Sequence, residues 1–261
     1  MKEGEKMKEW GIDISRWQKG LDLSQFKYAK FAIVKAGGSD DGLYIDSCFL
    51  DFYTQAKNLG WPVGIYWYTK AVSVTNLLTE IDYLLNNIKG LQFELPVFLD
   101  LEETVLYDKA GQLAVYWLNT LSEKGYYPGI YSSLSWWKDT LKNVSCDPVQ
   151  KWLALWGEYE DPGYDCGIWQ DGHIVTQGME VDSDYMYADY SFIKKKGLNG
   201  FSKEIHFADV PETDKGYKAI TWAGNNGYIY GYSDGTFRPD EPVTRRQLQI
   251  ELWRMAGRPE P

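Results

Sequence analysis

The chain has 261 residues and a formal net charge of −10. This length allows one large domain with a sizeable core and one small domain. The negative charge argues against a nucleic-acid partner, and no apolar run reaches the roughly 18 residues of a membrane span. With only three cysteines and two histidines, neither a disulfide framework nor a zinc site is expected, and no cofactor is implied.

Charge is unevenly distributed along the chain. Residues 1–200 carry nearly all of the net negative charge, whereas residues 201–261 are close to neutral. This difference predicts an acidic large domain followed by a separate tail. The segment Met1–Trp10 is charged and lacks the apolar region of a signal peptide, so we expect a protein that is made in the cytoplasm without an export signal.

Before the tail, short apolar runs alternate with longer helix-like stretches. The runs that indicate strands are Trp10–Ile14, Phe31–Ala36, Val63–Tyr68, Leu95–Leu101, Gly129–Ser132, Trp152–Trp156, Gly167–Gln170 and Glu180–Val181. The helix-like stretches, three of which are followed by a glycine typical of a C-cap, are Asp46–Leu59, Val74–Lys89, Lys109–Lys124 and Leu134–Leu141. This alternation predicts an α/β fold with a parallel sheet. About eight strands, the last of them closely spaced, favour an irregular TIM-like (β/α) barrel with fewer helices than strands.

The run Leu95–Leu101 leads into Asp100-Leu101-Glu102, the most informative sequence in the chain. Residues two apart on a strand point the same way, so Asp100 and Glu102 share one face. Two neighbouring carboxylates repel each other, and surroundings poor in water raise the pKa of at least one of them. Such a pair suits general acid catalysis, above all at glycosidic bonds.

Two further carboxylates fall at matching places. Asp13 ends the first strand and Asp182 follows the last one. If the sheet closes into a barrel, the first and last strands are neighbours, so Asp13 and Asp182 meet. Four acids would then surround one mouth at the carboxyl ends of the strands, where barrel active sites lie.

Taken together, these runs resemble glycoside hydrolase family 25 lysozymes over residues 10 to about 195. The segments that carry the resemblance are Gly11-Ile12-Asp13-Ile14-Ser15-Arg16-Trp17-Gln18, Phe31–Ala36, Val63–Tyr68, Leu95–Glu102, Trp152–Ala154, Ile168–Gln170 and Val181-Asp182. The resemblance implies a distorted barrel that cleaves the β-1,4 bond between N-acetylmuramic acid and N-acetylglucosamine in peptidoglycan. One departure is Ala36-Gly37-Gly38, which stands where that family more usually has Ala-Thr-Glu-Gly.

The resemblance also implies a role for each acid. Glu102 would be the general acid, and Asp100 would stabilise positive charge or orient the acetamido group or a water. Asp13 and Asp182 would tune the pKa of that pair and hold the sugar. Glu103 is expected to point away from the site. Aromatic side chains near the strand ends are expected to line a sugar cleft, with Trp17 a weaker candidate; they are Tyr66, Tyr68, Tyr131 and Trp169.

The tail follows a polar stretch and has a motif of its own. Residues 197–204 are expected to link a catalytic barrel (1–196) to a small helical unit (205–261). The string Gly231-Tyr232-Ser233-Asp234-Gly235-Thr236-Phe237-Arg238-Pro239 closely resembles a single surface-layer homology (SLH) motif. Such motifs bind secondary cell-wall polymers, and the residues expected to do so here are Arg245, Thr244, Gly231, Asp234 and Gly235.

The tail departs from that family in two ways. Thr244-Arg245-Arg246-Gln247 replaces the family's Thr-Arg-Ala-Glu, and one motif is present where three are usual. A unit of about 55 residues is marginally stable alone. We therefore expect it either to dock on the barrel or to assemble three chains into a homotrimer, which would raise avidity.

The sequence thus predicts a peptidoglycan muramidase with a wall-binding tail, of the phage endolysin type that is released at lysis. Two alternatives stay open. One is a carbohydrate-binding protein of the cell wall that keeps the barrel but lacks turnover. The other is a metal-dependent phosphoesterase, because clustered carboxylates also bind Mg²⁺. The favoured prediction, a muramidase, involves no metal.

Overall fold

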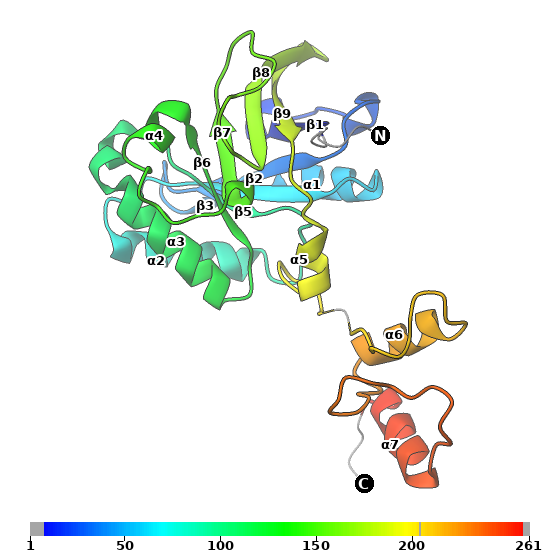
Figure 1. Cartoon of the computed structure of the whole chain (residues 1–261). Coiled ribbons are helices and arrows are strands. Elements are labelled where there is room, and N and C mark those ends of the chain that lie inside the picture. Colours follow the sequence, from blue (N-terminus) through cyan, green and yellow to red (C-terminus); the bar gives the residue numbers. More distant parts are fainter. Residues whose placement is uncertain (1–7, 204, 258–261) are drawn as a thin grey trace. The chain divides into compact units, whose positions relative to one another are not determined.

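Eight strands close into a barrel in the computed structural model, which describes residues 8–203 and 205–257 (Figure 1). Around the barrel the strand order is β1, β9, β8, β7, β6, β5, β4, β2, and parallel pairing of β2 with β1 closes the ring. These strands are β1 (Glu9–Ile14), β2 (Ala32–Gly38), β4 (Val63–Tyr68), β5 (Val97–Asp100), β6 (Pro128–Ser133), β7 (Lys151–Ala154), β8 (Ile168–Thr176) and β9 (Met179–Met186). A short strand, β3 (Tyr44–Ile45), pairs with the end of β2.

Helices cover the outside of the barrel because one side of each is apolar. In α2 (Val74–Asn87), Leu77, Ile81 and Leu84 recur at helical spacing and are fully buried. The other barrel helices are α1 (Phe49–Asn58), α3 (Ala110–Glu123) and α4 (Leu134–Lys138). Helix α5 (Ser191–Lys196) begins in the barrel unit, and its residues from Lys194 on belong to the second unit. The predicted barrel with fewer helices than strands is confirmed. None of the described helices combines the length and the apolar character needed to cross a bilayer.

The end of the barrel differs from the prediction of an all-parallel sheet. Strand β9 runs antiparallel to both β8 and β1, and it is much longer than the expected run Glu180–Val181. The turn between β8 and β9 holds only Gln177 and Gly178, both with positive φ (51° and 76°), as a tight hairpin requires. Two residues leave no room for a crossover helix, so the returning strand must be antiparallel.

The barrel interior has an apolar lower layer and a polar upper layer. Phe98 and Ile168 are buried inside, and the residues two positions further along their strands are Asp100 and Gln170. Side chains two apart share a face, so each polar residue stands above an apolar one. Space for the lower layer comes from glycine: a Cβ at Gly129 would lie 2.4 Å from the Phe98 ring.

The chain returns to the barrel after α5. Residues 198–201 belong to the barrel unit, although we expected them in the linker. Asn199, which has φ 53°, is fully buried; its amide donates to the carbonyls of Phe93 and Leu95 and accepts from the Tyr127 N–H. These bonds hold the segment in place. Of the expected boundaries, residues 1–7, 204 and 258–261 lie outside the described residues.

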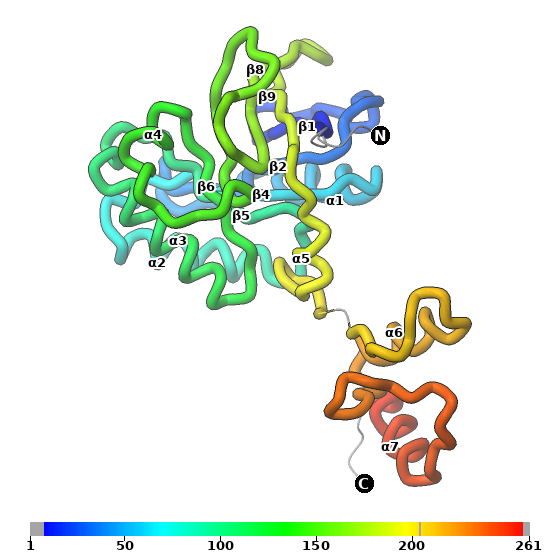
Figure 2. The backbone as a smooth tube through the Cα atoms, viewed as in Figure 1, coloured from blue at the N-terminus to red at the C-terminus, as the bar shows by residue number. Residues whose placement is uncertain are grey.

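The tail forms a second compact unit (Figure 2). Its helices are α6 (Tyr217–Asn225) and α7 (Arg245–Met255), and its small core contains Phe207, Val210 and Ile229. No residue of α7 is buried. The three cysteines of the chain, Cys48, Cys146 and Cys166, form no disulfide with one another.

Candidate active site

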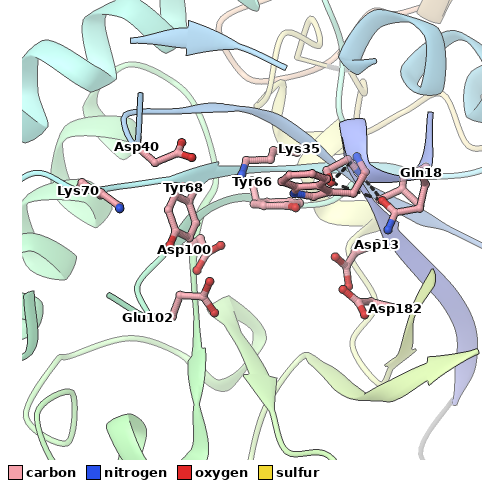
Figure 3. A pocket seen from close by; sticks show the side chains of 13 residues that line it. Asp13, Gln18, Lys35, Asp40, Tyr66, Tyr68, Lys70, Asp100, Glu102 and Asp182 are labelled. Atoms are coloured by element: carbon pink, nitrogen blue, oxygen red, sulfur yellow. Dashed lines mark hydrogen bonds between the residues drawn. The ribbon is translucent and has the colours of Figure 1, made fainter. Parts of the chain in front are cut away.

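The structure brings the four predicted acids to one end of the barrel, where they form two pairs (Figure 3). Asp100, the last residue of β5, and Glu102, just beyond it, point into the cleft from one side. Asp13 and Asp182 lie on the other side and point toward each other. The two pairs face each other across the cleft.

Asp182 reaches the rim because β9 runs antiparallel. It lies in the first half of β9 and pairs in register with Asp13, near the end of β1. In an antiparallel strand the first half lies beside the carboxyl ends of its parallel neighbours. The expected meeting of Asp13 and Asp182 therefore occurs, although Asp182 lies within a strand and not after one.

Burial and mutual repulsion raise the pKa of all four acids. Burial is the largest cause in each case: it raises the pKa of Asp13 to about 8 and that of Asp182 to about 6. The pKa of Asp100 lies well above its usual range because of burial and the nearby Glu102 charge. Glu102 also has a raised pKa, from burial and the charge of Glu103, whereas Lys35 opposes the shift. The cleft thus favours protonated carboxyls near neutral pH.

Glu102 and Glu103, although adjacent in sequence, have different surroundings. Glu102 is exposed, but its exposure faces the cleft, where it lines the cavity. Glu103 accepts a hydrogen bond from the Tyr68 hydroxyl and forms a salt bridge with Lys70 at 3.3 Å. It is absent from the lining of both hollows described next. Glu103 is therefore held by Tyr68 and Lys70 and lines neither hollow, although its charge still acts on Glu102.

The cleft consists of two hollows that share the acids. One, of about 360 Å³, extends toward Trp17, Lys35 and Lys70. The other, of about 200 Å³, extends toward Trp152 and Trp156. Both are lined by Asp13, Tyr66, Asp100, Glu102 and Asp182. A chain of sugars lying across both hollows would place one linkage over the carboxyl pairs.

Three of the four expected cleft aromatics line the cavity, and one does not. Tyr66, Tyr68 and Tyr131 are half-buried and contribute to its walls. Trp169 is fully buried, and its indole N–H donates to the Leu155 carbonyl at 2.9 Å. Since Gln170 faces the cleft, its neighbour on the strand faces the opposite way. The prediction that Trp169 lines the cleft is therefore wrong. Trp17, the weaker candidate, is 76% exposed and lines the larger hollow.

Three residues in or next to the cleft were missed by the sequence reasoning. Lys35 is buried and lies with its ammonium nitrogen 4.5 Å from the centre of the Tyr68 ring. Gln170 donates to Asp13 and accepts from two other residues of the smaller hollow, Tyr131 and Trp156. The third is Asp184, which is fully buried. The signal available in the sequence was period-two spacing, which puts Lys35, Gln170 and Asp184 on the inward faces of their strands.

Asp184 is a buried acid that supports Asp13. It has no exposed surface, and one of its oxygens accepts from the Trp152 indole N–H at 2.7 Å. Burial and the charge of the nearby Asp13 raise its pKa well above the usual range. Asp184 therefore favours its protonated form beside Asp13.

The acids are not arranged as a metal site. Among residues 8–203 and 205–257, no group of three or more His, Cys, Asp or Glu side chains has the geometry to hold a metal ion. Neutral donors instead contact one oxygen of each of two acids: Gln170 donates to Asp13 and Trp152 donates to Asp184.

The tail has its own groove, of about 450 Å³, between α7 and the preceding loops. Its walls include Tyr232, Arg238, Gln247 and Arg254. Of the five residues expected to bind a wall polymer, only Gly231 lines this groove. Gly231 has φ 64°, and a Cβ there would lie 2.4 Å from the Phe207 ring, so glycine is required.

The other four expected residues lie at turns and at the start of α7. The Thr244 hydroxyl accepts from the Gln247 N–H and the Gln247 side chain accepts from the Thr244 N–H, which together form a capping box. Gln247 thus performs the capping that the family's Glu would perform. Asp234 accepts from Thr236 and pairs with Arg238 at 2.8 Å, Gly235 has φ 81°, and Arg245 is the exposed first residue of α7.

Comparison with known proteins agrees with this geometry. Residues 12–179 match the glycosyl hydrolases family 25, and residues 206–248 match the S-layer homology domain. The autolytic lysozyme of Clostridium acetobutylicum is 26% identical, over 80% of this chain and 71% of that protein. Lysozyme M1 of Streptomyces globisporus is 27% identical, over 56% of this chain and 54% of its own length.

The fold is also shared with solved structures. The catalytic domain of endolysin ply40, from bacteriophage P40 of Listeria monocytogenes, superposes with a TM-score of 0.61 at 21% identity. The match covers 72% of this chain and 98% of that domain. Since the family match spans more than half of the chain and coincides with the barrel and its acid-lined cleft, the chain belongs to glycosyl hydrolase family 25 and is a lysozyme that carries an S-layer homology unit.

Proposed function

We propose that Glu102 is the general acid that cleaves the β-1,4 bond after N-acetylmuramic acid in peptidoglycan. Its raised pKa keeps a proton available near neutral pH, and its carboxyl is exposed to the cleft where a glycosidic oxygen would lie. Donating that proton to the leaving oxygen breaks the bond to the sugar carbon. A water then supplies the oxygen of the new reducing end.

Asp100 would assist from beside Glu102. One of its carboxyl oxygens is buried and has no hydrogen-bond partner among the described residues. That oxygen is available to accept the N–H of a substrate acetamido group or to stabilise positive charge on the sugar ring. The charge of Asp182, on the opposite side, favours the protonated form of Glu102.

The observation that carries this proposal is the convergence of four acids on one cleft from β1, β5 and β9. A purely carbohydrate-binding barrel has no need for a crowded group of carboxyls with raised pKa, since crowding costs folding free energy. Membership of glycosyl hydrolase family 25 favours glycoside hydrolysis over the phosphoesterase alternative.

Product analysis tests the reaction directly. Purified cell walls digested by the full chain and examined by mass spectrometry should yield new reducing ends that are muramic acid. Reducing glucosamine would mean cleavage at the other glycosidic bond, and free peptide would mean an amidase or peptidase. Binding without any new reducing end would establish the non-catalytic alternative.

The SLH unit is a cell-wall binding module, and we propose that it holds the enzyme on a secondary wall polymer. Arg238 and Arg254 line the groove and offer guanidinium groups to a carboxylate-bearing polymer. Pull-down of walls with and without their secondary polymer tests this binding. Loss of retention is expected only when the polymer is removed.

We propose further that three chains assemble through the tail. Helix α7 buries no residue, and it exposes apolar side chains that include Leu248 (47%), Leu252 (48%) and Met255 (53%). Covering them in a homotrimer would bring three wall sites together. Sedimentation of the full chain at micromolar concentration should show a trimer, and a monomer would contradict the assembly.

Release at lysis is the last part of the proposal. The fold matches the catalytic domain of a phage endolysin, which supports an enzyme that reaches the wall when the producing cell is opened. Fractionation of cells that express the chain, with and without a pore-forming protein, should show wall cleavage only when the pore is present.

A further inference from the structure

We propose that Gln170 is a positioning residue. It holds the Asp13 carboxylate in place and links it by hydrogen bonds to Tyr131 and Trp156 in the wall of the smaller hollow. This inference rests on the proposed function, because it concerns how one of the four acids is set for the reaction. It begins from a chain of hydrogen bonds that crosses three strands.

The side-chain amide of Gln170 makes three bonds and has almost no exposed surface. Its nitrogen donates to Asp13 Oδ2 at 2.8 Å. Its oxygen accepts from the Tyr131 hydroxyl and from the Trp156 indole N–H, each at 2.9 Å. Gln170 is 3% exposed, so water cannot replace these partners without a change in the cleft.

Chemistry fixes which way the amide faces. An indole N–H can only donate, so the amide oxygen must face Trp156. The NH₂ group is then forced toward Asp13, where it needs an acceptor. Gln170 therefore favours the acceptor form of Asp13 at Oδ2, while burial and the surrounding acids favour the protonated form. The hydrogen bond from the amide therefore opposes, at Asp13 Oδ2, the effect of burial and of the neighbouring acids.

The surroundings of Asp13 show why the contact is needed. Charged and titratable groups face it from most strands of the barrel: Asp182 and Asp184 from β9, Glu102 and Asp100 at the end of β5, Tyr66 from β4 and Tyr131 from β6. Lys35 from β2 lines the same cleft. Among the described residues around Asp13, Gln170 is the neutral amide donor, and Asp184 supports Asp13 from below.

The sharpest variant is Gln170→Glu, which keeps the size of the side chain. One carboxyl oxygen can still accept from Trp156 and Tyr131. The other faces Asp13 and can donate only while it carries a proton. We expect near wild-type kcat at about pH 5 and a loss of about ten- to hundredfold by pH 8, the range for a lost hydrogen bond to a charged group.

Companion variants separate positioning from folding. Gln170→Met removes the donor at every pH and should lower kcat by the same ten- to hundredfold at both pH 5 and pH 8, with KM changed less than twofold. Gln150→Glu is the matched control. Gln150 is a half-buried glutamine whose amide donates to the Pro128 carbonyl outside the cleft, and this change should leave the pH profile as in the wild type.

A double-mutant cycle with Asp13→Asn gives the second readout. If Gln170 acts through Asp13, Gln170→Met should cost less than twofold in the Asp13→Asn background. Equal costs in both backgrounds, or a Gln170→Glu profile that matches the wild type, would overturn the proposal. Failure of the proposed function is distinguishable, because the wild type itself would then produce no reducing muramic acid.

Discussion

Carboxylates behave in opposite ways in the two units of this chain. In the barrel cleft, burial and like charges raise the pKa of the acids, to about 8 for Asp13. In the tail, hydrogen bonds and an arginine lower the pKa of fully exposed carboxyls, to about 2 for Asp234. Carboxyl groups therefore favour their protonated form in the barrel cleft, whereas in the tail they stay ionised and form ion pairs and caps.

The difference teaches how each unit uses charge. The tail has a small core of a few residues, so charged caps that hold its loops help to define its fold. Asp209 accepts from two successive backbone N–H groups, of Phe237 and Arg238, at 2.8 and 2.7 Å. The barrel has a large core and can tolerate a destabilising group of acids at its mouth.

The largest expected effect is a difference in the rate of wall hydrolysis between variants of two adjacent glutamates, Glu102 and Glu103. Glu102→Gln should lower the rate of wall hydrolysis by about 10²- to 10⁴-fold, because the proton donor is lost. Glu103→Gln is its matched control and should lower the rate less than tenfold, since Glu103 is held by Tyr68 and Lys70. Release of reducing ends measures both rates. Comparable losses in the two variants would contradict the assignment.

The next effect tests the tail's use of charge. Asp209→Ala removes the acceptor of two backbone N–H groups and should weaken retention on walls about fivefold. Hydrolysis of soluble glycan fragments should not change. Asp240→Ala, at another exposed acid of the same unit, is the control. Equal retention of the two variants would show that this cap is dispensable.

A third test concerns stability against pH in the barrel. The pKa of Asp13 is raised from 3.8 to about 8 in the folded state, so folding binds a proton. Its stabilising contribution is complete below about pH 4 and is lost as pH rises toward 8. Asp13→Asn resembles the protonated form and should raise the free energy of unfolding at pH 8 by about 1–2 kcal/mol, with little change at pH 4.

Urea denaturation at both pH values measures this effect, and Asp41→Asn, at an exposed acid, is the control. A variant that is less stable than the wild type at pH 8 would mean that Asp13 contributes to the fold as an anion.

The smallest expected effect is that of pH on wall retention by the tail. Asp234 has a pKa lowered to about 2, so its contribution to stability is present above pH 4 and is lost only as pH falls toward 2. Wall retention should therefore stay within twofold between pH 5 and pH 8, whereas the rate of hydrolysis changes. A parallel decline in both would place a titrating group in the tail.

The sequence predicts best what depends on local spacing. Strand β4 has the bounds expected from its apolar run, and the acids on β1 and β5 occur where period-two alternation places them. The direction of β9 was missed because the tight turn at Gln177-Gly178 was not recognised. Trp169 was assigned to the cleft, although it is Gln170, one position further on, that faces it.

Other parts of the cleft could not be predicted because their partners are distant in the sequence. The surroundings that set the pKa of Asp184 include Trp152 and Asp13, which come from two other strands. Lys35 lies beside Tyr68 and the acids only once the barrel has closed. Pairings of this kind depend on barrel closure, which no short window of sequence contains.

The antiparallel pairing of β9 with β1 ties two of the four acids to a contact between the two ends of the barrel sequence. Asp13 and Asp182 stand opposite each other in that seam, yet nearly the whole barrel sequence separates them. Contacts between such distant segments form late and slowly. A chain that ends before β9 would lack Asp182, so the complete set of four acids requires the closed barrel.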